Sequence, residues 1–196
     1  MMMFSKRLFR TRSTAVASAR KAGFLRRRDR LAVLLTGLLT GLLLSTGLQA
    51  GELTPSPLTP SQDTTPVLTL QASDRREKLS LADIERLPLF EASMKHPEGP
   101  EGVYSGVLLD DLLASHALDD AERLRLVAVD NYSVFLSPAQ LSDKTYLLVT
   151  RFDGSPIPRS QQGPLMLVVP ADEEAVLEGQ EAFDKWIWSL NRINAS

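Results

Sequence analysis

The sequence of 196 residues contains no cysteine. Without a thiol, the chain can form no disulfide, no thiolate metal site and no cysteine nucleophile. Its two histidines, His96 and His116, do not have a ligand spacing such as i, i+4, so they do not suggest a metal site. The sequence also lacks a glycine-rich phosphate loop and a serine in a nucleophile-elbow pattern. We therefore expect no metal site and no catalytic residues.

Positive charge is scarce outside the N-terminus. Residues 1–30 hold ten of the 22 Lys and Arg residues, with Asp29 as their one acid. Residues 51–196 hold 12 basic and 23 acidic residues, a formal net charge of −11. Because binding to phosphates requires a basic surface, we expect no nucleic-acid partner.

The N-terminal 50 residues have the pattern of a secretory signal. A basic region precedes an apolar run, Leu31 to Leu44, and a small residue for cleavage follows at Ala50. The run is shorter than the roughly 20 residues of a membrane span. This predicts export to the periplasm, either with cleavage after Ala50 or with residues 1–50 kept as an uncleaved membrane anchor. Residues 51–66 contain four prolines among Thr and Ser and are predicted to be a disordered or extended linker.

The remaining residues, 67–196, form one predicted domain of short strands and short helices. Strands are expected at 67–70, 124–129, 132–136, 146–150, 165–169 and 186–193, and a weak strand followed by a loop at 91–104. Helices are expected after Ser80, at 107–113, after Ser137, and between 172 and 183. Ser80 and Asp83 have the spacing of a capping box. This mixture predicts an α+β fold with a mixed or mostly antiparallel sheet.

The stretch from Tyr146 to Pro170 has the clearest local pattern. Two β-type runs flank the turn dipeptide Asp153-Gly154, and the prolines that follow exclude helix and central strand. The loop carries Arg151, Gln162 and other polar residues. Loops held by flanking strands often carry binding groups.

Five motifs together resemble a known family, the oxidoreductase molybdopterin-binding domains of sulfite-oxidase type. In chain order they are LSLADIERLP, YSGVLLDDLL, AVDNYSVFLS, RFDGSPIPRSQQGPLMLVVP and WIWSLNRI. The resemblance covers residues 67–193 and implies the sulfite-oxidase-like molybdopterin-binding fold.

The sequence departs from that family at the metal ligand. Sulfite-oxidase-type enzymes ligate molybdenum with a cysteine in the segment before the Gly-Val-Leu-Leu run. Here that segment is Phe90 to His96 and has no thiol. Thioether and imidazole do not replace a soft anionic ligand for molybdenum. We therefore expect no molybdenum and no molybdenum catalysis.

The chain is more similar to a small exported, cysteine-free branch of this fold. Proteins of that branch act as periplasmic pterin receptors, which bind a pterin without metal and pass ligand status to a membrane-bound cyclic-di-GMP cyclase/phosphodiesterase. The resemblance implies that a tryptophan near the C-terminus stacks on the pterin, here Trp188 or Trp186. Packing in the core is the alternative for both.

Four further residues are candidates for pterin contact. Asn131 and Tyr132 lie at a predicted hairpin tip, where they can bond the edge of a pterin or serve only as turn and strand residues; Asp130 has the same two interpretations. Arg151 can bind a carbonyl or anionic group with its fork of donors.

The sequence thus predicts a non-catalytic periplasmic pterin-binding protein that signals to an inner-membrane diguanylate cyclase/phosphodiesterase. One alternative is a molybdopterin-dependent oxidoreductase, or a subunit of one, with an unusual metal ligand. Another is a scaffold subunit whose pocket is vestigial.

Overall fold

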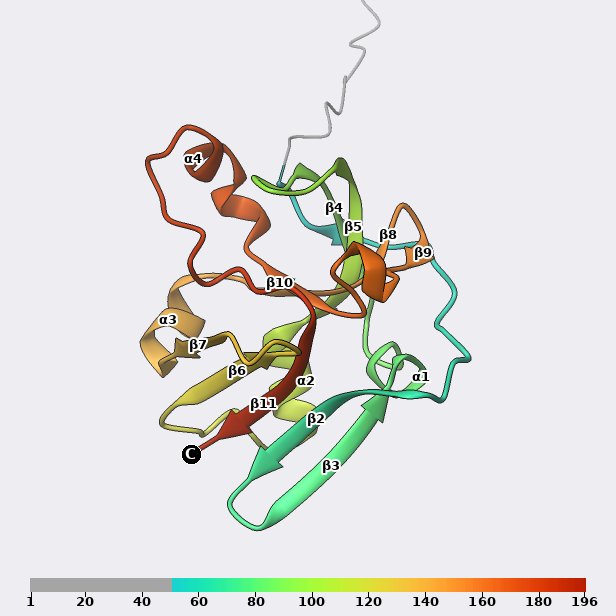
Figure 1. Cartoon of the computed structure of the whole chain (residues 1–196), viewed down its shortest axis with the longest axis vertical. Coiled ribbons are helices and arrows are strands. Elements are labelled where there is room, and N and C mark those ends of the chain that lie inside the picture. Colours follow the sequence, from blue (N-terminus) through green and yellow to red (C-terminus); the bar gives the residue numbers. More distant parts are fainter. Residues whose placement is uncertain (1–50) are drawn as a thin grey trace, which may run out of the picture. The chain divides into compact units, whose positions relative to one another are not determined.

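The computed structural model describes residues 51–196 (Figure 1). The predictions of a basic region, a secretory signal and a membrane anchor fall on residues 1–50 and lie outside the described residues. Within residues 51–196, no helix has the length and apolar character that crossing a membrane requires.

The described chain forms two β-sheets. One is six-stranded, in the order β1-β4-β5-β8-β10 with β9 also paired to β8. The other is five-stranded, in the order β3-β2-β11-β6-β7. All pairs are antiparallel except β2 with β11. The strands are β1 (Thr54–Pro55), β2 (Pro66–Ala72), β3 (Arg75–Ser80), β4 (Phe90–Lys95), β5 (Glu101–Leu108), β6 (Leu124–Ala128), β7 (Ser133–Leu136), β8 (Leu147–Phe152), β9 (Ser155–Pro156), β10 (Met166–Val168) and β11 (Leu190–Ala195). The predicted α+β class with a mostly antiparallel arrangement is confirmed.

The helices are short, and two of them, α1 and α3, begin at the caps expected at Ser80 and Ser137. They are α1 (Leu81–Ile84), α2 (Leu109–Ser115), α3 (Pro138–Asp143) and α4 (Glu173–Leu177), with 3-10 turns at Arg159–Gln161 and Pro170–Asp172. The predicted capping box is confirmed: the Asp83 N–H donates to Ser80 Oγ (3.1 Å) and the Ser80 N–H donates to Asp83 Oδ2 (3.0 Å). Ser137 caps α3 in the same way.

The region around Gly106 differs from its prediction. Residues 101–108 form one strand, β5, and the helix expected from Val107 begins only at Leu109. A Cβ on Gly106 would lie 2.0 Å from the Leu148 carbonyl oxygen, and the ladder shifts register there. Glycine therefore allows β5 to approach β8 closely. A short apolar run is compatible with a buried strand as well as with a helix, and for this reason the predicted helix start at Val107 was wrong.

The C-terminal prediction was wrong in its first half. The strand begins at Leu190, not Trp186, because Ser189 has φ of +48° and a bulge lies between Leu190 and Arg192. Trp186, Trp188 and Leu190 therefore do not follow one strand face. The preceding helix is also shorter than expected and ends at Leu177.

The hydrophobic core is formed by side chains from both sheets and from α2. The Leu147, Leu148 and Val149 side chains of β8 are fully buried, as are Leu109 and Leu112 of α2. All the buried hydrophobic residues of the described chain lie between Leu68 and Ile193.

The proline-rich residues 51–66 are extended and lie against this core. β1 pairs with β4, the Ser56 N–H donates to the Leu89 carbonyl (2.8 Å), and the Ala82 N–H donates to the Asp63 carbonyl (2.9 Å). Residues 51–66, which the sequence predicts as a disordered or extended linker, are thus attached to the domain by backbone hydrogen bonds.

Candidate functional site

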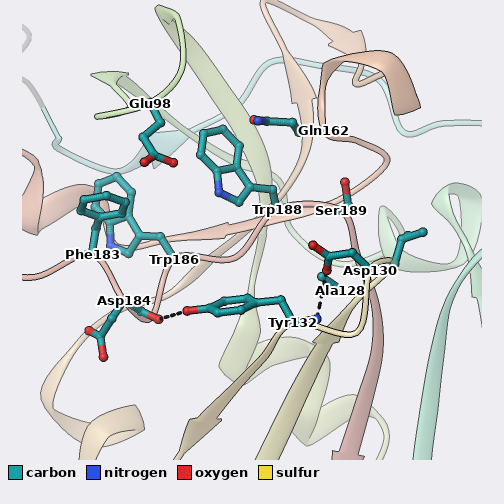
Figure 2. A pocket seen from close by; sticks show the side chains of 11 residues that line it. Glu98, Ala128, Asp130, Tyr132, Gln162, Phe183, Asp184, Trp186, Trp188 and Ser189 are labelled. Carbon is teal, nitrogen blue, oxygen red and sulfur yellow. Dashed lines mark hydrogen bonds between the residues drawn. The ribbon is translucent and has the colours of Figure 1, made fainter.

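One cavity of about 540 Å³ brings together four of the predicted site residues (Figure 2). It lies where the hairpin tip between β6 and β7 meets the segment that leads into β11. Its lining consists of Glu98, Ala128, Val129, Asp130, Tyr132, Gln162, Phe183, Asp184, Trp186, Trp188 and Ser189. A volume of several hundred Å³ is typical of sites for small ligands.

Trp188 is positioned by hydrogen bonds on both sides of it. Ile187 exchanges two backbone bonds with Leu167 of β10 (2.8 and 3.1 Å). The Ser189 N–H donates to the Gln162 carbonyl (2.8 Å). The backbone around Trp188 is therefore tied to the long loop between β8 and β10, the loop that the sequence predicted as a binding element.

The aromatic side of the cavity rests on a buried histidine. The His96 ring lies 4.0 Å from the Trp188 ring and 5.2 Å from the Trp186 ring, centroid to centroid. Burial lowers the pKa of His96 to about 4, so the imidazole is neutral near pH 7. Its Nδ1 accepts from the Glu98 N–H (3.2 Å), which leaves the proton of the neutral ring on Nε2. A neutral imidazole thus supports both indoles.

The hairpin tip forms the opposite side. Asn131 adopts φ of +69° and its N–H donates to the Ala128 carbonyl (3.0 Å), while the Tyr132 N–H donates to Asp130 Oδ1 (3.0 Å). The Tyr132 hydroxyl reaches the Asp184 carbonyl (3.4 Å) across the cavity (Figure 2). Tyr132 itself is 51% exposed, so a planar ligand can reach its ring.

The charged groups around the cavity are all acidic. Glu98, Asp130 and Asp184 contribute carboxylates, and no Lys or Arg is among the described lining residues. Carboxylates accept hydrogen bonds from N–H groups and repel phosphates. The cavity is therefore suited to a flat ligand with N–H donors and no phosphate.

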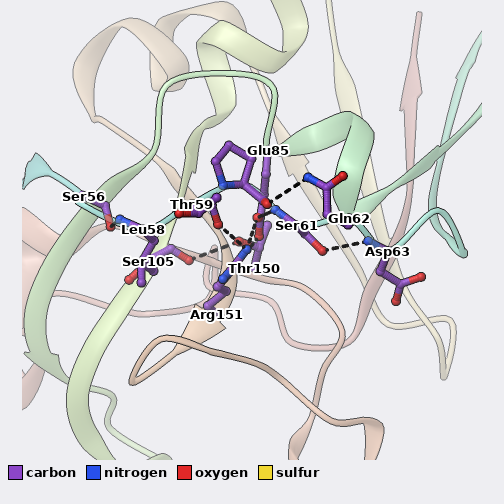
Figure 3. A network of polar contacts seen from close by, with 11 residues as sticks. Ser56, Leu58, Thr59, Ser61, Gln62, Asp63, Glu85, Ser105, Thr150 and Arg151 are labelled. Atoms are coloured by element: carbon purple, nitrogen blue, oxygen red, sulfur yellow. Dashed lines mark hydrogen bonds and ion pairs between the residues drawn. The ribbon is translucent and has the colours of Figure 1, made fainter.

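Arg151 lies elsewhere, in a network beneath the proline-rich segment (Figure 3). Its guanidinium pairs with Glu85 through both Nε (3.0 Å) and Nη2 and also donates to the Thr59 carbonyl (3.0 Å). The Glu85 carboxylate, fully buried, accepts from the Ser61 N–H as well (2.6 Å). Burial alone would raise the pKa of Glu85, but hydrogen bonding from Arg151, Thr150 and Ser61 together with the charge of Arg151 outweighs it, and the pKa is lowered. The guanidinium of Arg151 thus binds the protein itself.

The structure thus divides the predicted site residues into three groups. Four of them meet at the cavity: Asp130, Tyr132, Trp186 and Trp188. Asn131 shapes the adjacent turn without lining the cavity, and Arg151 is remote.

Sequence reasoning missed Glu98, Phe183 and Asp184 as lining residues. Glu98 lies two residues after His96 in a stretch predicted as a loop. Phe183 and Asp184 lie at the end of the helix that the sequence predicted, and that prediction gave no reason to place them beside the tryptophans.

The available donors do not fit the molybdenum cofactor that the fold family implies. The chain has no thiolate, the cavity has no basic group for a phosphate, and residues 51–196 contain no cluster of three or more His, Asp or Glu that can hold a metal ion. His96 packs against aromatic rings, and His116 Nδ1 lies 3.1 Å from Glu77. An unmetallated heterocycle fits better than a metal complex.

Comparisons with known proteins identify the fold. No protein-family model matches the sequence, and no curated protein matches it. The crystal structure of the sulfane dehydrogenase SoxCD from Paracoccus pantotrophus is similar, with a TM-score of 0.50 and 16% sequence identity. The match covers 67% of this chain and 38% of that one, so this chain spans well under half the length of the protein it resembles. At this identity the similarity concerns the fold, and it agrees with the sulfite-oxidase-like molybdopterin-binding fold that the sequence motifs imply.

Proposed function

We propose that this protein binds a pterin without molybdenum and without catalysing a reaction on it. The observation that supports this most is the cavity itself, which combines two tryptophans and a tyrosine with three carboxylates and no basic group. The absence of cysteine from the whole sequence removes the soft anionic ligand that molybdenum requires in this fold.

The ring system of a pterin matches the two kinds of group in the cavity. Its flat face can stack on Trp188, a contact worth about 1–3 kcal/mol for nucleobases on aromatic side chains. Its 2-amino group and neighbouring ring N–H are adjacent donors, and a carboxylate can accept both at once. A phosphorylated pterin would meet the charges of Glu98, Asp130 and Asp184 and is expected to bind more weakly.

We further propose that the protein works in the periplasm and relays pterin occupancy to a membrane signalling protein of the cyclic-di-GMP type. The N-terminal signal pattern and the resemblance to periplasmic pterin receptors support this. Val129 and Tyr132 are 47% and 51% exposed at the cavity. A ligand that covers them would change the surface that a partner meets.

Calorimetric titration with a reduced, unphosphorylated pterin tests the binding proposal. We expect micromolar or tighter binding, a loss of about 5- to 150-fold in Trp188→Ala from the stacking energy, and little change in the control Phe135→Ala. Phe135 is 40% exposed on β7 and does not line the cavity. No binding to the wild-type protein at millimolar pterin would contradict the proposal.

A molybdopterin-dependent oxidoreductase, or a subunit of one, is the second candidate. The similarity to the sulfane dehydrogenase SoxCD favours it. Elemental analysis of protein purified from a molybdenum-replete host separates the two functions. About one molybdenum per chain would support the oxidoreductase, and a content near zero together with bound pterin would support the receptor.

A further inference from the structure

Glu173, the first residue of α4, is a buried acid with one unpaired oxygen. The residue is 7% exposed, and its Oε1 accepts from the Lys95 N–H (2.6 Å). Its Oε2 is buried and has no hydrogen-bond partner among the described residues. A buried carboxylate oxygen without a donor is unfavourable, because it loses its hydration without replacement.

Gly51 lies directly beside that oxygen. It is buried, and its N–H donates to the Ser93 carbonyl (3.1 Å). A Cβ built on Gly51 would lie 3.6 Å from Glu173 Oε2 and 2.2 Å from the Pro170 carbonyl oxygen. Since a Cβ lies about 2.5 Å from its own backbone nitrogen, Oε2 is at most about 6 Å from the Gly51 nitrogen. Only glycine allows this approach.

The number of donors on the Gly51 nitrogen depends on whether the chain is cleaved. In an intact chain this nitrogen is an amide with one donor, which the Ser93 carbonyl already accepts. As a chain terminus it would be an ammonium with three donors. Three acceptors lie near Gly51: the Ser93 carbonyl, which accepts from its N–H, and the Pro170 carbonyl and Glu173 Oε2, which lie close to the position that a Cβ would take.

We propose that proteolytic processing after Ala50 creates an α-ammonium on Gly51, and that this ammonium forms a buried ion pair with Glu173. Hydrolysis of the Ala50–Gly51 bond consumes one water. The Ala50 carbonyl carbon gains the hydroxyl and becomes a carboxylate, and the Gly51 nitrogen becomes an amine that is protonated near neutral pH. The sequence places a secretory cleavage site at this bond independently, through the basic region, the apolar run and Ala50. The pair would join the mature N-terminus to α4 and β4.

The inference can be tested on chains that differ by one residue. Because the buried hydrophobic residues of the described part, 51–196, all lie between Leu68 and Ile193, a chain beginning at Gly51 retains this core. We would compare the melting temperature of a chain with a free Gly51 amine with that of a chain that keeps Ala50 before it. The Gly51 chain is expected to melt roughly 6–20 °C higher, the range expected when a buried charge has its partner in a domain of this size.

Two variants decide whether Glu173 is the partner. In Glu173→Gln the advantage of the free Gly51 amine should disappear, whereas Glu174→Gln, an exposed neighbour on the same helix, should preserve it. Mass spectrometry of the full-length protein after export should give an N-terminus at Gly51. Equal melting temperatures for the two chains, an advantage that survives Glu173→Gln, or an N-terminus at another residue would each overturn the proposal.

Discussion

Replacing Arg151 distinguishes a structural from a ligand-binding role for this residue. The substitution Arg151→Met keeps most of the side-chain volume and removes the charge and all its donors. In the structure those donors pair with Glu85, whose side chain is fully buried, while the Arg151 side chain is 12% exposed. The variant would therefore leave a buried carboxylate without its counter-charge.

The expected loss of stability is large because the pair is shielded from water. Breaking a buried ion pair by removing one partner typically costs about 3–5 kcal/mol. For a domain of about 150 residues this corresponds to a fall in melting temperature of about 6–20 °C. The proline-rich segment should loosen as well, since Arg151 also donates to the Thr59 carbonyl.

Urea unfolding followed by circular dichroism measures this effect. Arg159→Met is the matched control, because Arg159 is exposed in the segment between β8 and β10, and it should change stability by less than about 0.5 kcal/mol. The double variant Glu85→Gln/Arg151→Met should recover much of the loss, since no buried charge remains. Unchanged stability of Arg151→Met combined with a loss of pterin affinity would refute the structural assignment.

Three other perturbations test the fold and the electrostatics. Burial lowers the pKa of His96 to about 4, below the ordinary 6.5. Between these two pH values the unfolded chain binds a proton at His96 and the folded protein does not. The free energy of unfolding should therefore be unaffected by His96 titration above pH 6.5 and should fall as the pH is lowered toward 4. His96→Phe should flatten that decline in denaturant midpoints measured against pH, and an unchanged slope would contradict the assignment. Ser80→Ala should cost about 1 kcal/mol by removing the cap of α1, and equal urea midpoints would count against the capping box. Leu148→Ala, at a fully buried position, should cost about 2–5 kcal/mol, and a cost like that of a surface substitution would show that β8 is not central.

Local signals in the sequence predicted most of the elements. Ser80 with Asp83 and Ser137 with Pro138 marked two helix starts, and both caps form. The paired runs around Asp153-Gly154 became β8 and β10, which pair as expected. These predictions succeeded because capping and turn chemistry involve residues close together in the chain.

The errors arose where distant contacts decided the conformation. Val107 lies in β5, where it pairs with Leu148 of β8, and does not start a helix. At Ser189 the extended backbone is interrupted by a positive φ, and the Ser189 N–H donates to the Gln162 carbonyl. Neither partner is near in sequence. Apolar periodicity over a short segment cannot distinguish a buried strand from a helix.

Contacts between residues distant in the sequence also explain why only part of the site was predicted. Trp188 and Tyr132 were chosen from residue type and resemblance, and the structure brings both to one cavity. Arg151 was chosen for its chemistry alone, and its buried partner Glu85 lies 66 residues earlier. The acidic character of the cavity emerges only when Glu98, Asp130 and Asp184 converge from three parts of the chain.

The most direct test of the account is a mass analysis of what the protein carries. Protein purified under anaerobic conditions from the periplasm of its native host would be denatured, and the released small molecules and metals measured. The account predicts an unphosphorylated pterin, near one per chain for wild type and strongly reduced for Trp188→Ala, without stoichiometric molybdenum. A molybdenum-bound, phosphorylated pterin, or wild-type protein that carries no pterin and takes up none when it is added, would contradict it.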